Sequence, residues 1–339
     1  MSEGPVAPMA MAAVDASAAL WRVPLGLLSP AGGRGCLAIL IFHRVHAQPD
    51  ALFPGEMHAA TFRARLDWVR RVCNVLPLGE AVDRLAERRL PSRALAITFD
   101  DGYADNATVA LPILRELGIP ATFFVATGFL DGGRMWNDTV IEAVRRTRSP
   151  QLDLGALGLP RVDVANDASR RTTIAALLPA LKRLPSDARQ ASVDRIAEIA
   201  AAELPDDLMM TAADVRKLAA AGMGVGAHTI THPILSVVDD VTARREMASS
   251  REALERLLGE RVRFFAYPNG KPTTDYRKRH VALAREVGFD AAFSTAPGAG
   301  RAGDSPFELP RFTPWDRTPL RWGARLARNY LVPVERAAA

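Results

Sequence analysis

Cysteine is scarce in this chain, which has only Cys36 and Cys73 among its 339 residues. A framework of several disulfides is therefore excluded, and we interpret both thiols as small buried side chains in a reducing compartment, with a single disulfide as the alternative. Long apolar runs are also missing, since the run 36–42 is far shorter than the ~20 residues that a membrane-spanning helix needs. The segment 1–20 has no basic start and lacks the layout of a secretory signal. We expect a cytoplasmic protein without a transmembrane segment, whose contact with a membrane is at most peripheral.

Aromatic residues are few as well, at 6% of the chain, and the net charge of +5 is not gathered in one block. Basic residues occur as scattered pairs such as Arg70-Arg71 and Arg170-Arg171. Nucleic-acid-binding domains more often carry a clustered basic stripe with interleaved aromatic residues. The composition therefore argues against a nucleic-acid partner, whereas the mild basicity suits an acidic glycan or a lipid headgroup surface.

What the sequence does contain is an alternation of strand-like and helix-like segments from Cys36 onward. Strands that alternate with helices are parallel strands joined by crossovers, so the expected fold is α/β, either a barrel or a doubly wound sheet. The segment 131–221 interrupts this alternation and separates two strands by far more residues than a βα connection needs. It is predicted to be mostly helical, with Thr211 as an N-cap near its end. We interpret it as a helical insertion packed on the scaffold or, alternatively, as a lid or substrate-shaping subdomain.

Two motifs at predicted strand ends carry the chemistry. Asp100 and Asp101 follow an apolar strand in "LAITFDDG", and a histidine pair, His228 and His232, stands in "GAHTITHP". Ligands gather at the carboxyl ends of parallel strands, so these side chains are expected to meet. Taken alone, Asp-Asp-Gly is commonly a turn or a helix cap, and such a histidine pair is more often structural than metal-binding.

Two histidines and one carboxylate are, however, the ligand set of a catalytic zinc site. Asp101 could supply the oxygen ligand, because two adjacent carboxylates at a strand end cannot point the same way. Asp100 would then face a water on the ion, whose pKa the metal lowers, and accept its proton as general base. The combination of both motifs favours this interpretation over two unrelated structural features.

The two motifs also resemble those of a known family. Thr98–Gly102 (TFDDG) and His228–His232 (HTITH) are similar to the first two signature motifs of the polysaccharide deacetylases, the NodB-homology family (carbohydrate esterase family 4). The likeness spans residues 36–318 and implies a distorted (β/α) barrel of about seven parallel strands with a helical insertion. It also implies metal-dependent removal of N-acetyl groups from a polymeric or lipid-linked sugar, with Asp100 as general base. The implied metal ligands are Asp101, His228 and His232, and zinc is the expected ion, with cobalt or manganese as replacements.

The third family motif is changed in this sequence. It usually reads Arg-x-Pro-Tyr-Gly, but the matching stretch is Ala266–Gly270 (AYPNG), which has no arginine. Arg311, in "LPRF", is the candidate that orients the base in its place, and the alternative for this residue is a surface salt bridge. The resemblance assigns the matching residues to substrate binding and to the oxyanion site, with the Asn269 amide as donor. The residues so assigned are Tyr267, Pro268 and Asn269.

The last family motif, a leucine followed by a histidine that serves as general acid, is also missing. No histidine follows His280, which lies in a predicted basic helix. His43, in "IFHRV" at the end of the first predicted strand, is the candidate substitute, as in a branch of the family with an N-terminal histidine of this kind. A histidine that titrates near neutral pH suits protonation of a leaving amine. The alternative for His43 is a hydrogen-bonded residue that only closes the barrel.

The expected function is therefore metal-dependent hydrolysis of the N-acetyl group of a sugar in a polysaccharide or a lipid-linked glycan precursor. One alternative is the same barrel acting on another non-peptide C–N bond, and another is a catalytically silent glycan-binding protein. The complete Asp-Asp-His-His set favours the enzyme, because a site freed from catalysis has no need of a base beside its ligands. The expected division of the chain is a loosely ordered lead-in (1–33), a first barrel part (34–130), the insertion (131–221), a second barrel part (222–318) and a basic C-terminal helix or tail (319–339).

Overall fold

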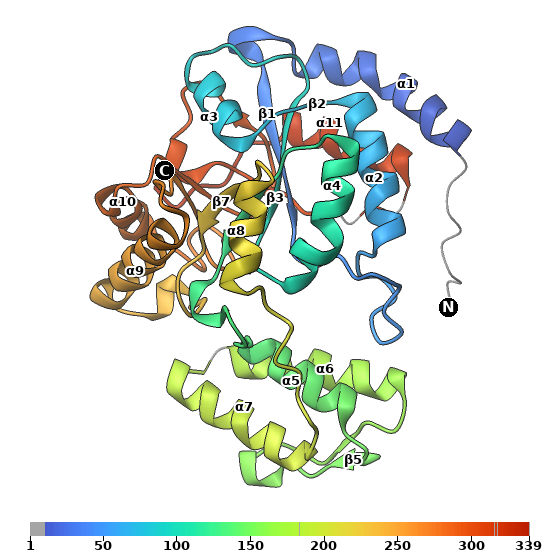
Figure 1. The fold of residues 1–339 in the computed structure, drawn as a ribbon, viewed down its shortest axis with the longest axis vertical. Helices are drawn as coiled ribbons and strands as arrows, with labels where there is room; N and C mark the ends of the chain where they lie inside the picture. The colour runs from blue at the N-terminus through green and yellow to red at the C-terminus, as the bar shows by residue number, and fades with distance from the viewer. Residues whose placement is uncertain (1–10, 183, 315, 317, 339) are drawn as a thin grey trace.

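The structure is a computed structural model that describes residues 11–182, 184–314, 316 and 318–338. Its centre is a curled, mostly parallel sheet with helices around it, and a separate helical layer lies at one end (Figure 1). In chain order the strands are β1 (Cys36–Phe42), β2 (Asn74–Val75), β3 (Ala94–Phe99), β4 (Thr122–Val125), β5 (Gln151–Leu152), β6 (Val162–Asp163), β7 (Gly224–Ala227), β8 (Phe264–Ala266), β9 (Ala291–Phe293) and β10 (Gly300–Arg301).

The main sheet has the strand order β10-β1-β3-β4-β7-β8-β9, and β2 lies beside β3. Every pairing in it is parallel except that of β1 with β10. β1 and β3 are buried along their whole length, as expected for parallel strands that are covered on both faces. The predicted α/β class and the distorted barrel of about seven parallel strands are therefore confirmed.

The curled sheet is closed by the short segment around Arg311, which lies between β9 and β1. Leu309 pairs with Phe293 of β9, and Phe312 pairs with Leu40 of β1, each in a parallel bridge. Because this segment touches both ends of the sheet, a residue between the two bridges is held at the barrel's seam. Arg311 occupies that position.

Side chains along the strands alternate between two hydrophobic clusters. Leu37 and Ile39 of β1 belong to the cluster inside the barrel, whereas Ala38 and Leu40 belong to the cluster beneath the outer helices. This alternation also decides which residues at the strand ends point into the barrel. In chain order the helices are α1 (Met11–Leu28), α2 (Ala59–Val72), α3 (Leu78–Ala86), α4 (Leu111–Leu117), α5 (Trp136–Arg146), α6 (Asp167–Lys182), α7 (Ser186–Ala200), α8 (Ala212–Ala220), α9 (Asp240–Leu258), α10 (Lys278–Val287) and α11 (Pro319–Leu331).

The predicted lead-in 1–33 contains the helix α1, so the expectation of a loosely ordered segment is wrong from residue 11 onward. Leu25 is fully buried, and α1 packs against α2 and α11. Trp68 of α2 donates a hydrogen bond of 3.2 Å to Ser17 of α1. Tertiary contacts therefore order this segment, although its composition alone does not predict a helix. Residues 1–10 of the predicted lead-in lie outside the described residues.

The helical layer consists of α5, α6, α7 and the hairpin of β5 and β6, and it has its own hydrophobic cluster (Figure 1). Val140 and Val144 of α5, Leu177 of α6 and Ile196 of α7 belong to this cluster. α8, the last helix within 131–221, packs instead against β7 and α9 of the barrel. The chain thus passes from the barrel into the layer after β4 and returns to the barrel through α8.

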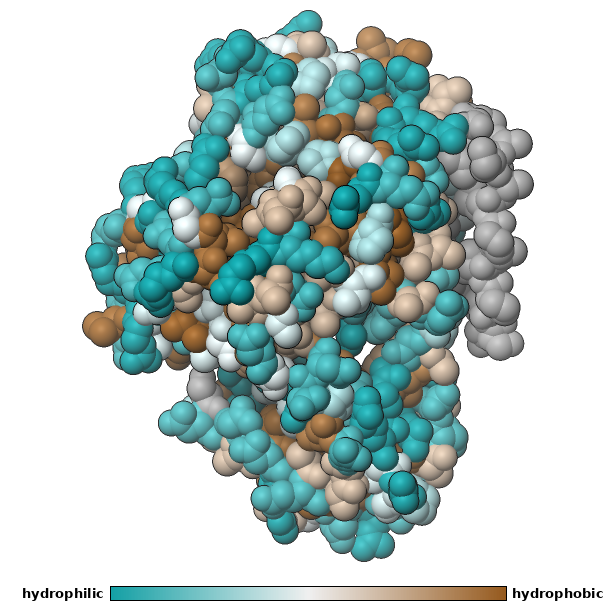
Figure 2. All heavy atoms as spheres, in the orientation of Figure 1, coloured by the Kyte–Doolittle hydropathy of each residue, from teal (hydrophilic) through white to brown (hydrophobic). Residues whose placement is uncertain are grey.

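The C-terminal helix α11 packs against α1 and β1 and buries Trp322, Leu326 and Tyr330. The face of the molecule in Figure 2 is mostly hydrophilic, with smaller hydrophobic areas between the hydrophilic side chains. In the part of the chain that the structure describes, no helix is both long enough and apolar enough to span a membrane.

Truncation of Leu25 tests the packing of α1. Because this side chain is fully buried, Leu25→Ala is expected to lower the free energy of unfolding by about 2–5 kcal/mol. Leu27 lies on the same helix but is 78% exposed, so Leu27→Ala is the matched control and should change the free energy of unfolding by less than about 0.5 kcal/mol. Urea unfolding followed by circular dichroism measures both variants. Equally small effects would show that α1 is not packed in solution.

Candidate active site

Asp100 points into the barrel just beyond the end of β3. The alternation that turns Ala96 inward continues through Thr98 to Asp100, whose exposed fraction is only 2%. Its two carboxylate oxygens accept hydrogen bonds of 2.7 and 2.8 Å from the two terminal nitrogens of Arg311. Burial alone would raise the pKa of Asp100, but the charge of Arg311 and the nearby histidines hold it below its ordinary value. Asp100 is therefore an ionised carboxylate inside the barrel.

Arg311 is completely buried, so the alternative of a surface salt bridge is wrong for this residue. Its guanidinium also donates to the Thr98 hydroxyl and to the Ser294 carbonyl, and it lies 5.1 Å from the ring centre of Phe124. A planar guanidinium can pair with a carboxylate through two hydrogen bonds and stack on an aromatic ring, which an ammonium group cannot do equally well. The segment that closes the barrel thus brings an arginine to Asp100, although the third motif has none.

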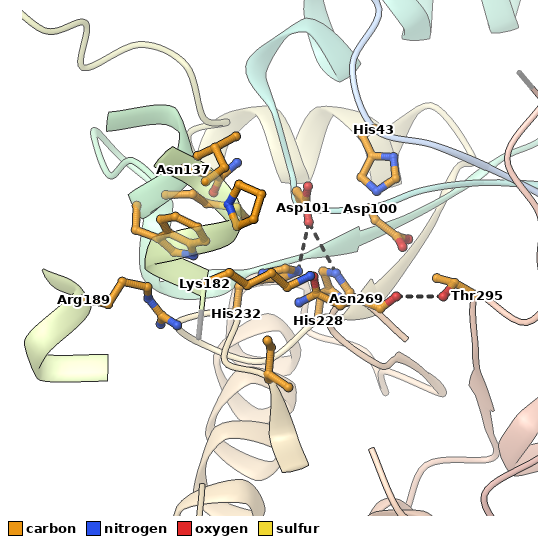
Figure 3. A pocket seen from close by; sticks show the side chains of 15 residues that line it. His43, Asp100, Asp101, Asn137, Lys182, Arg189, His228, His232, Asn269 and Thr295 are labelled. Atoms are coloured by element: carbon orange, nitrogen blue, oxygen red, sulfur yellow. Dashed lines mark hydrogen bonds and ion pairs between the residues drawn. The ribbon is translucent and has the colours of Figure 1, made fainter. Parts of the chain in front are cut away.

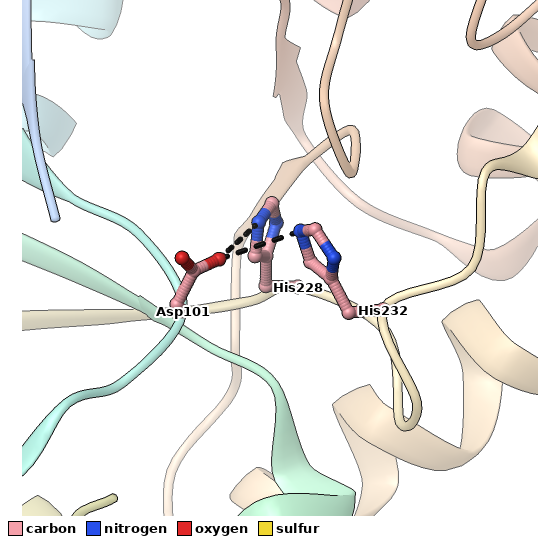
Figure 4. Close-up of side chains that lie close together, drawn as sticks. All are labelled: Asp101, His228 and His232. Carbon is pink, nitrogen blue, oxygen red and sulfur yellow. Dashed lines mark ion pairs between the residues drawn. The ribbon is translucent and has the colours of Figure 1, made fainter. Parts of the chain in front are cut away.

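Asp101, His228 and His232 converge (Figure 4), and all three line the same cavity as Asp100. Asp101 Oδ1 lies 3.4 Å from Nε2 of His228 and 3.4 Å from Nε2 of His232. Ligand atoms held about 2.1 Å from a tetrahedral zinc ion lie about 3.4 Å from one another, so these separations suit such an ion. One carboxylate and two imidazoles also leave coordination positions for water or substrate. The three residues therefore fit a divalent metal ion.

The orientation and charge of the two imidazoles also suit metal binding. Nδ1 of His228 donates a hydrogen bond of 2.8 Å to the Ala266 carbonyl, which leaves Nε2 free to act as a ligand. Burial lowers the pKa of His232 to about 4, so its ring is neutral at neutral pH. Burial also acts to lower the pKa of His228, but the hydrogen bond with Asp101 and the charge of Asp100 raise it above its ordinary value. A bound cation would take the place of the proton that these carboxylates attract.

Glu246 of α9 holds the loop between the two histidines. Its carboxylate accepts hydrogen bonds from the main-chain N–H groups of Ile230 (2.7 Å) and Thr231 (2.9 Å), and from the Thr231 hydroxyl (2.8 Å). Thr229 and His232 have φ angles of 65° and 53°, which non-glycine residues keep only where surrounding contacts hold them. Glu246 is not predictable from the sequence, because α9 is rich in charged residues along its whole length.

His43 lines the cavity beside the carboxylates (Figure 3). The polar turn that follows the two aspartates fixes the main chain around it: Asn106 donates to the His43 carbonyl (2.8 Å), and the Val45 N–H donates to Asp105 (3.0 Å). The motif "TFDDGYADN" and the His43 loop are thus one structural unit. Within the described residues the His43 ring itself makes no hydrogen bond, so the alternative of a hydrogen-bonded residue that closes the barrel is not observed.

Of the three residues assigned to the third motif, only Asn269 lines the cavity. Strand alternation turns Tyr267 to the outer face of the barrel, where its hydroxyl donates to the Phe307 carbonyl (3.0 Å) and its ring stacks on Tyr276. Pro268 is buried and does not line the cavity either. The side chains of Tyr267 and Pro268 therefore support the loop, and the expected contact with substrate is corrected for both.

The cavity above these residues has a volume of about 380 Å³, a size typical of small-molecule sites (Figure 3). The ends of the barrel strands form one wall, and the helical layer forms the other. The sequence carried no signal for the basic residues of this second wall, because isolated basic residues are common on exposed helices. The helical wall consists of Trp136, Asn137, Leu178, Pro179, Lys182 and Arg189.

Comparison with known families decides the relationship. The sequence matches the family model described as Polysaccharide deacetylase over residues 87–150 and 163–292, more than half of the chain. The chain belongs to the polysaccharide deacetylase family. The matched ranges include both motifs, TFDDG and HTITH, and the resemblance inferred from them is thereby confirmed.

The individual proteins similar to this chain are distant in sequence, and those with solved structures have a similar fold. The chain is 20% identical to YxkH of Bacillus subtilis (strain 168) over 277 residues, which cover 81% of this chain and 70% of YxkH. The Streptococcus pyogenes deacetylase PplD in complex with acetate superposes with a TM-score of 0.57 at 18% identity, over 87% of this chain and 98% of PplD. IcaB from Ammonifex degensii superposes with a TM-score of 0.54 at 22% identity, over 90% and 99% of the two chains. These structures share the barrel fold with this chain.

Removal of Arg311 tests the buried ion pair of this polysaccharide deacetylase. Arg311→Met leaves the Asp100 charge buried without a partner and is expected to lower the free energy of unfolding by about 3–5 kcal/mol. Adding Asp100→Asn to that variant removes the stranded charge and should restore part of the loss. Arg263 pairs with Asp83 and Asp290 at the surface, so Arg263→Met is the control and should cost about 0–1 kcal/mol. Urea unfolding of metal-free protein measures each variant, and strictly additive effects of the two buried changes would contradict the pairing.

Replacement of Glu246 tests its hold on the histidine loop. Glu246→Gln exchanges one acceptor oxygen for an amide that faces N–H and O–H donors, so zinc affinity is expected to fall about 10- to 100-fold. Glu252, on the same helix, is exposed, and Glu252→Gln is the matched control with unchanged affinity. Competition with a chromogenic chelator measures the affinity of both variants. The same zinc affinity in Glu246→Gln and in the control would show that the loop keeps its shape without this carboxylate.

Proposed function

We propose that this chain is a metal-dependent deacetylase that hydrolyses the N-acetyl group of a sugar in a polysaccharide or a lipid-linked glycan. The observation that carries the proposal is the different surroundings of two adjacent carboxylates. Asp101 faces two imidazoles, whereas Asp100 faces an arginine and the cavity. Membership of the polysaccharide deacetylase family supports the reaction class. The proposed ion is zinc, and its proposed ligands are Asp101, His228 and His232.

A divalent ion bound by these three residues would supply Lewis acidity, which lowers the pKa of a coordinated water and polarises an acetamide carbonyl. Asp100 is the proposed general base and accepts a proton from the attacking water. Two hydrogen bonds from Arg311 keep that carboxylate ionised and in one orientation. The main-chain N–H of Asn269 has no acceptor among the described residues and is the proposed donor to the developing oxyanion.

His43 is the proposed general acid. It lines the same cavity as Asp100, so Asp100 can accept a proton from the attacking water while His43 donates a proton to the leaving nitrogen of the same substrate. The water oxygen bonds to the carbonyl carbon, the C–N bond breaks, and the leaving nitrogen takes the His43 proton. The products are acetic acid, which gives up its proton as acetate, and an amine, which takes up that proton at neutral pH. The proton on Asp100 returns to His43 through solvent before the next turnover.

Substitutions at the two aspartates separate chemistry from metal binding. Asp100→Asn is expected to reduce acetate release from N-acetylated sugars about 10²- to 10⁴-fold, because the general base is lost, while about one zinc ion per chain is retained. His232→Ala should lose both the ion and the activity, because a ligand is removed. Acetate assays and elemental analysis of the same samples give both readouts.

Three outcomes of this experiment would contradict the proposal in different ways. Near-full turnover by Asp100→Asn would exclude this residue as the base. A wild-type protein that takes up no metal even when zinc is supplied would exclude the metal mechanism. A bound ion without acetate release from any N-acetylated sugar would point to another C–N bond or to a glycan-binding protein.

A further inference from the structure

The two walls of the cavity carry different ionisable groups. The barrel wall contributes the carboxylates of Asp100 and Asp101 together with imidazoles. The helical wall has no carboxylate among its lining residues, and its charged members are Lys182 and Arg189. Lys182 extends across the cavity to Asn269 beside the proposed metal ligands, and Arg189 lies farther to the side of the same cavity (Figure 3). A molecule in the cavity would therefore have one end near the carboxylates and another near two cations.

Arg189 is a buried cation without a counter-charge. Its exposed fraction is 8%, and its guanidinium carbon lies 5.2 Å from the ring centre of Trp136, which fixes its plane. No carboxylate in the described part of the chain pairs with it, and burial lowers its pKa. The other arginine that is buried among the described residues, Arg311, has Asp100 as its partner. Because Arg189 lines the cavity and its side chain donates no hydrogen bond to the described part of the chain, its N–H donors are available to an anion that is supplied from outside the chain.

Lys182 adds a second cation to the same wall of the cavity. Its ammonium group donates a hydrogen bond of 2.6 Å to Asn269 Oδ1 and so reaches from α6 across to the barrel. An ammonium group has three donors, and within the described residues no carboxylate pairs with this one. The remaining donors are available to a ligand next to Asn269, the residue whose main-chain N–H is the proposed oxyanion donor.

We propose that Arg189 and Lys182 form a subsite for an oxyanion of the substrate, a carboxylate or a phosphate carried by the N-acetylated sugar or by its neighbour. This inference rests on the proposed function, because it names the substrate class of the same site. A guanidinium binds either oxyanion through two parallel hydrogen bonds, and an ammonium group adds a point charge. The same two cations repel the ammonium groups that repeated deacetylation creates along a neutral polymer. The substrate class is therefore an acidic glycan or a glycosyl phosphate.

Three sugars with the same acetamide group test this subsite. N-acetylglucosamine has no anion, its 1-phosphate carries a phosphate, and N-acetylmuramic acid carries a carboxylate. The wild type is expected to have a higher kcat/KM for an anionic sugar than for the neutral one. Arg189→Gln should reduce the ratio of kcat/KM for the anionic sugar to kcat/KM for the neutral sugar about 10- to 100-fold, and Arg189→Lys should recover part of this ratio. The anionic sugar with the higher kcat/KM identifies whether phosphate or carboxylate is bound.

Arg195→Gln is the matched control, because Arg195 lies on the same helix, is 51% exposed and pairs with Glu198. Its ratio of kcat/KM values should equal that of the wild type. A melting temperature of Arg189→Gln equal to that of the wild type shows that the fold is kept. If the melting temperature of Arg189→Gln is lower, the kcat/KM values of Arg189→Lys are compared with those of the wild type instead. Equal kcat/KM values for neutral and anionic sugars in the wild type would overturn the inference, as would an equal loss for both sugars in Arg189→Gln.

Calorimetry separates failure of the subsite from failure of the proposed function. Asp100→Asn protein, with and without Arg189→Gln, is titrated with each sugar at low and high salt. Binding of an anionic sugar that depends on Arg189 and weakens with salt supports the subsite, even where no sugar releases acetate and the proposed function fails. Acetate release from neutral sugar, combined with anion binding that does not depend on Arg189, overturns the subsite and leaves the proposed function intact. Absence of any anionic binding overturns the subsite as well.

Discussion

The buried ion pair between Asp100 and Arg311 joins the closure of the barrel to the chemistry of the cavity. Neither charge can be buried alone without a cost of several kcal/mol, so the two elements that carry them depend on each other. β3 delivers Asp100, and the segment between the bridges to β9 and β1 delivers Arg311. A slip of one residue in that segment would turn Arg311 out of the barrel and strand the carboxylate. The proposed catalytic base therefore also specifies the register in which the barrel closes.

Separation along the chain explains which parts of the site could be predicted from the sequence. The aspartates and the two histidines stand in short motifs at strand ends, and the structure brings them together. Arg311 is 211 residues from Asp100, so the sequence alone left open whether it is buried or at the surface. Glu246 reaches the histidine loop only because α9 packs against that end of the barrel, and no local pattern encodes this contact.

The same distinction between local and distant contacts explains which parts of the fold are predictable from the sequence. The apolar strand runs and the cap at Thr211, which forms a capping box with Asp214 at the start of α8, depend on neighbouring residues and were predictable. Tyr267 was misassigned because a motif match does not say to which side of the strand a residue turns. α1 is not predictable from its own residues, because its stability depends on packing against α2 and α11. α11 lies at the opposite end of the chain, so no local pattern indicates this contact.

If the proposed anion subsite is correct, the helical layer changes which glycans the barrel accepts as substrates. Arg311 balances the charge of Asp100, and the proposed divalent ion would balance that of Asp101, so the barrel wall by itself gives little preference between neutral and acidic glycans. On the proposed assignment, the cations of the helical wall supply that preference: they attract an oxyanion at a distance from the acetamide and repel a substrate that already carries many amines. Lys182 reaches from this wall to Asn269 beside the proposed oxyanion donor, so recognition and chemistry meet at one residue. The barrel thus supplies the proposed reaction, and the layer inserted into it supplies the proposed preference among glycans.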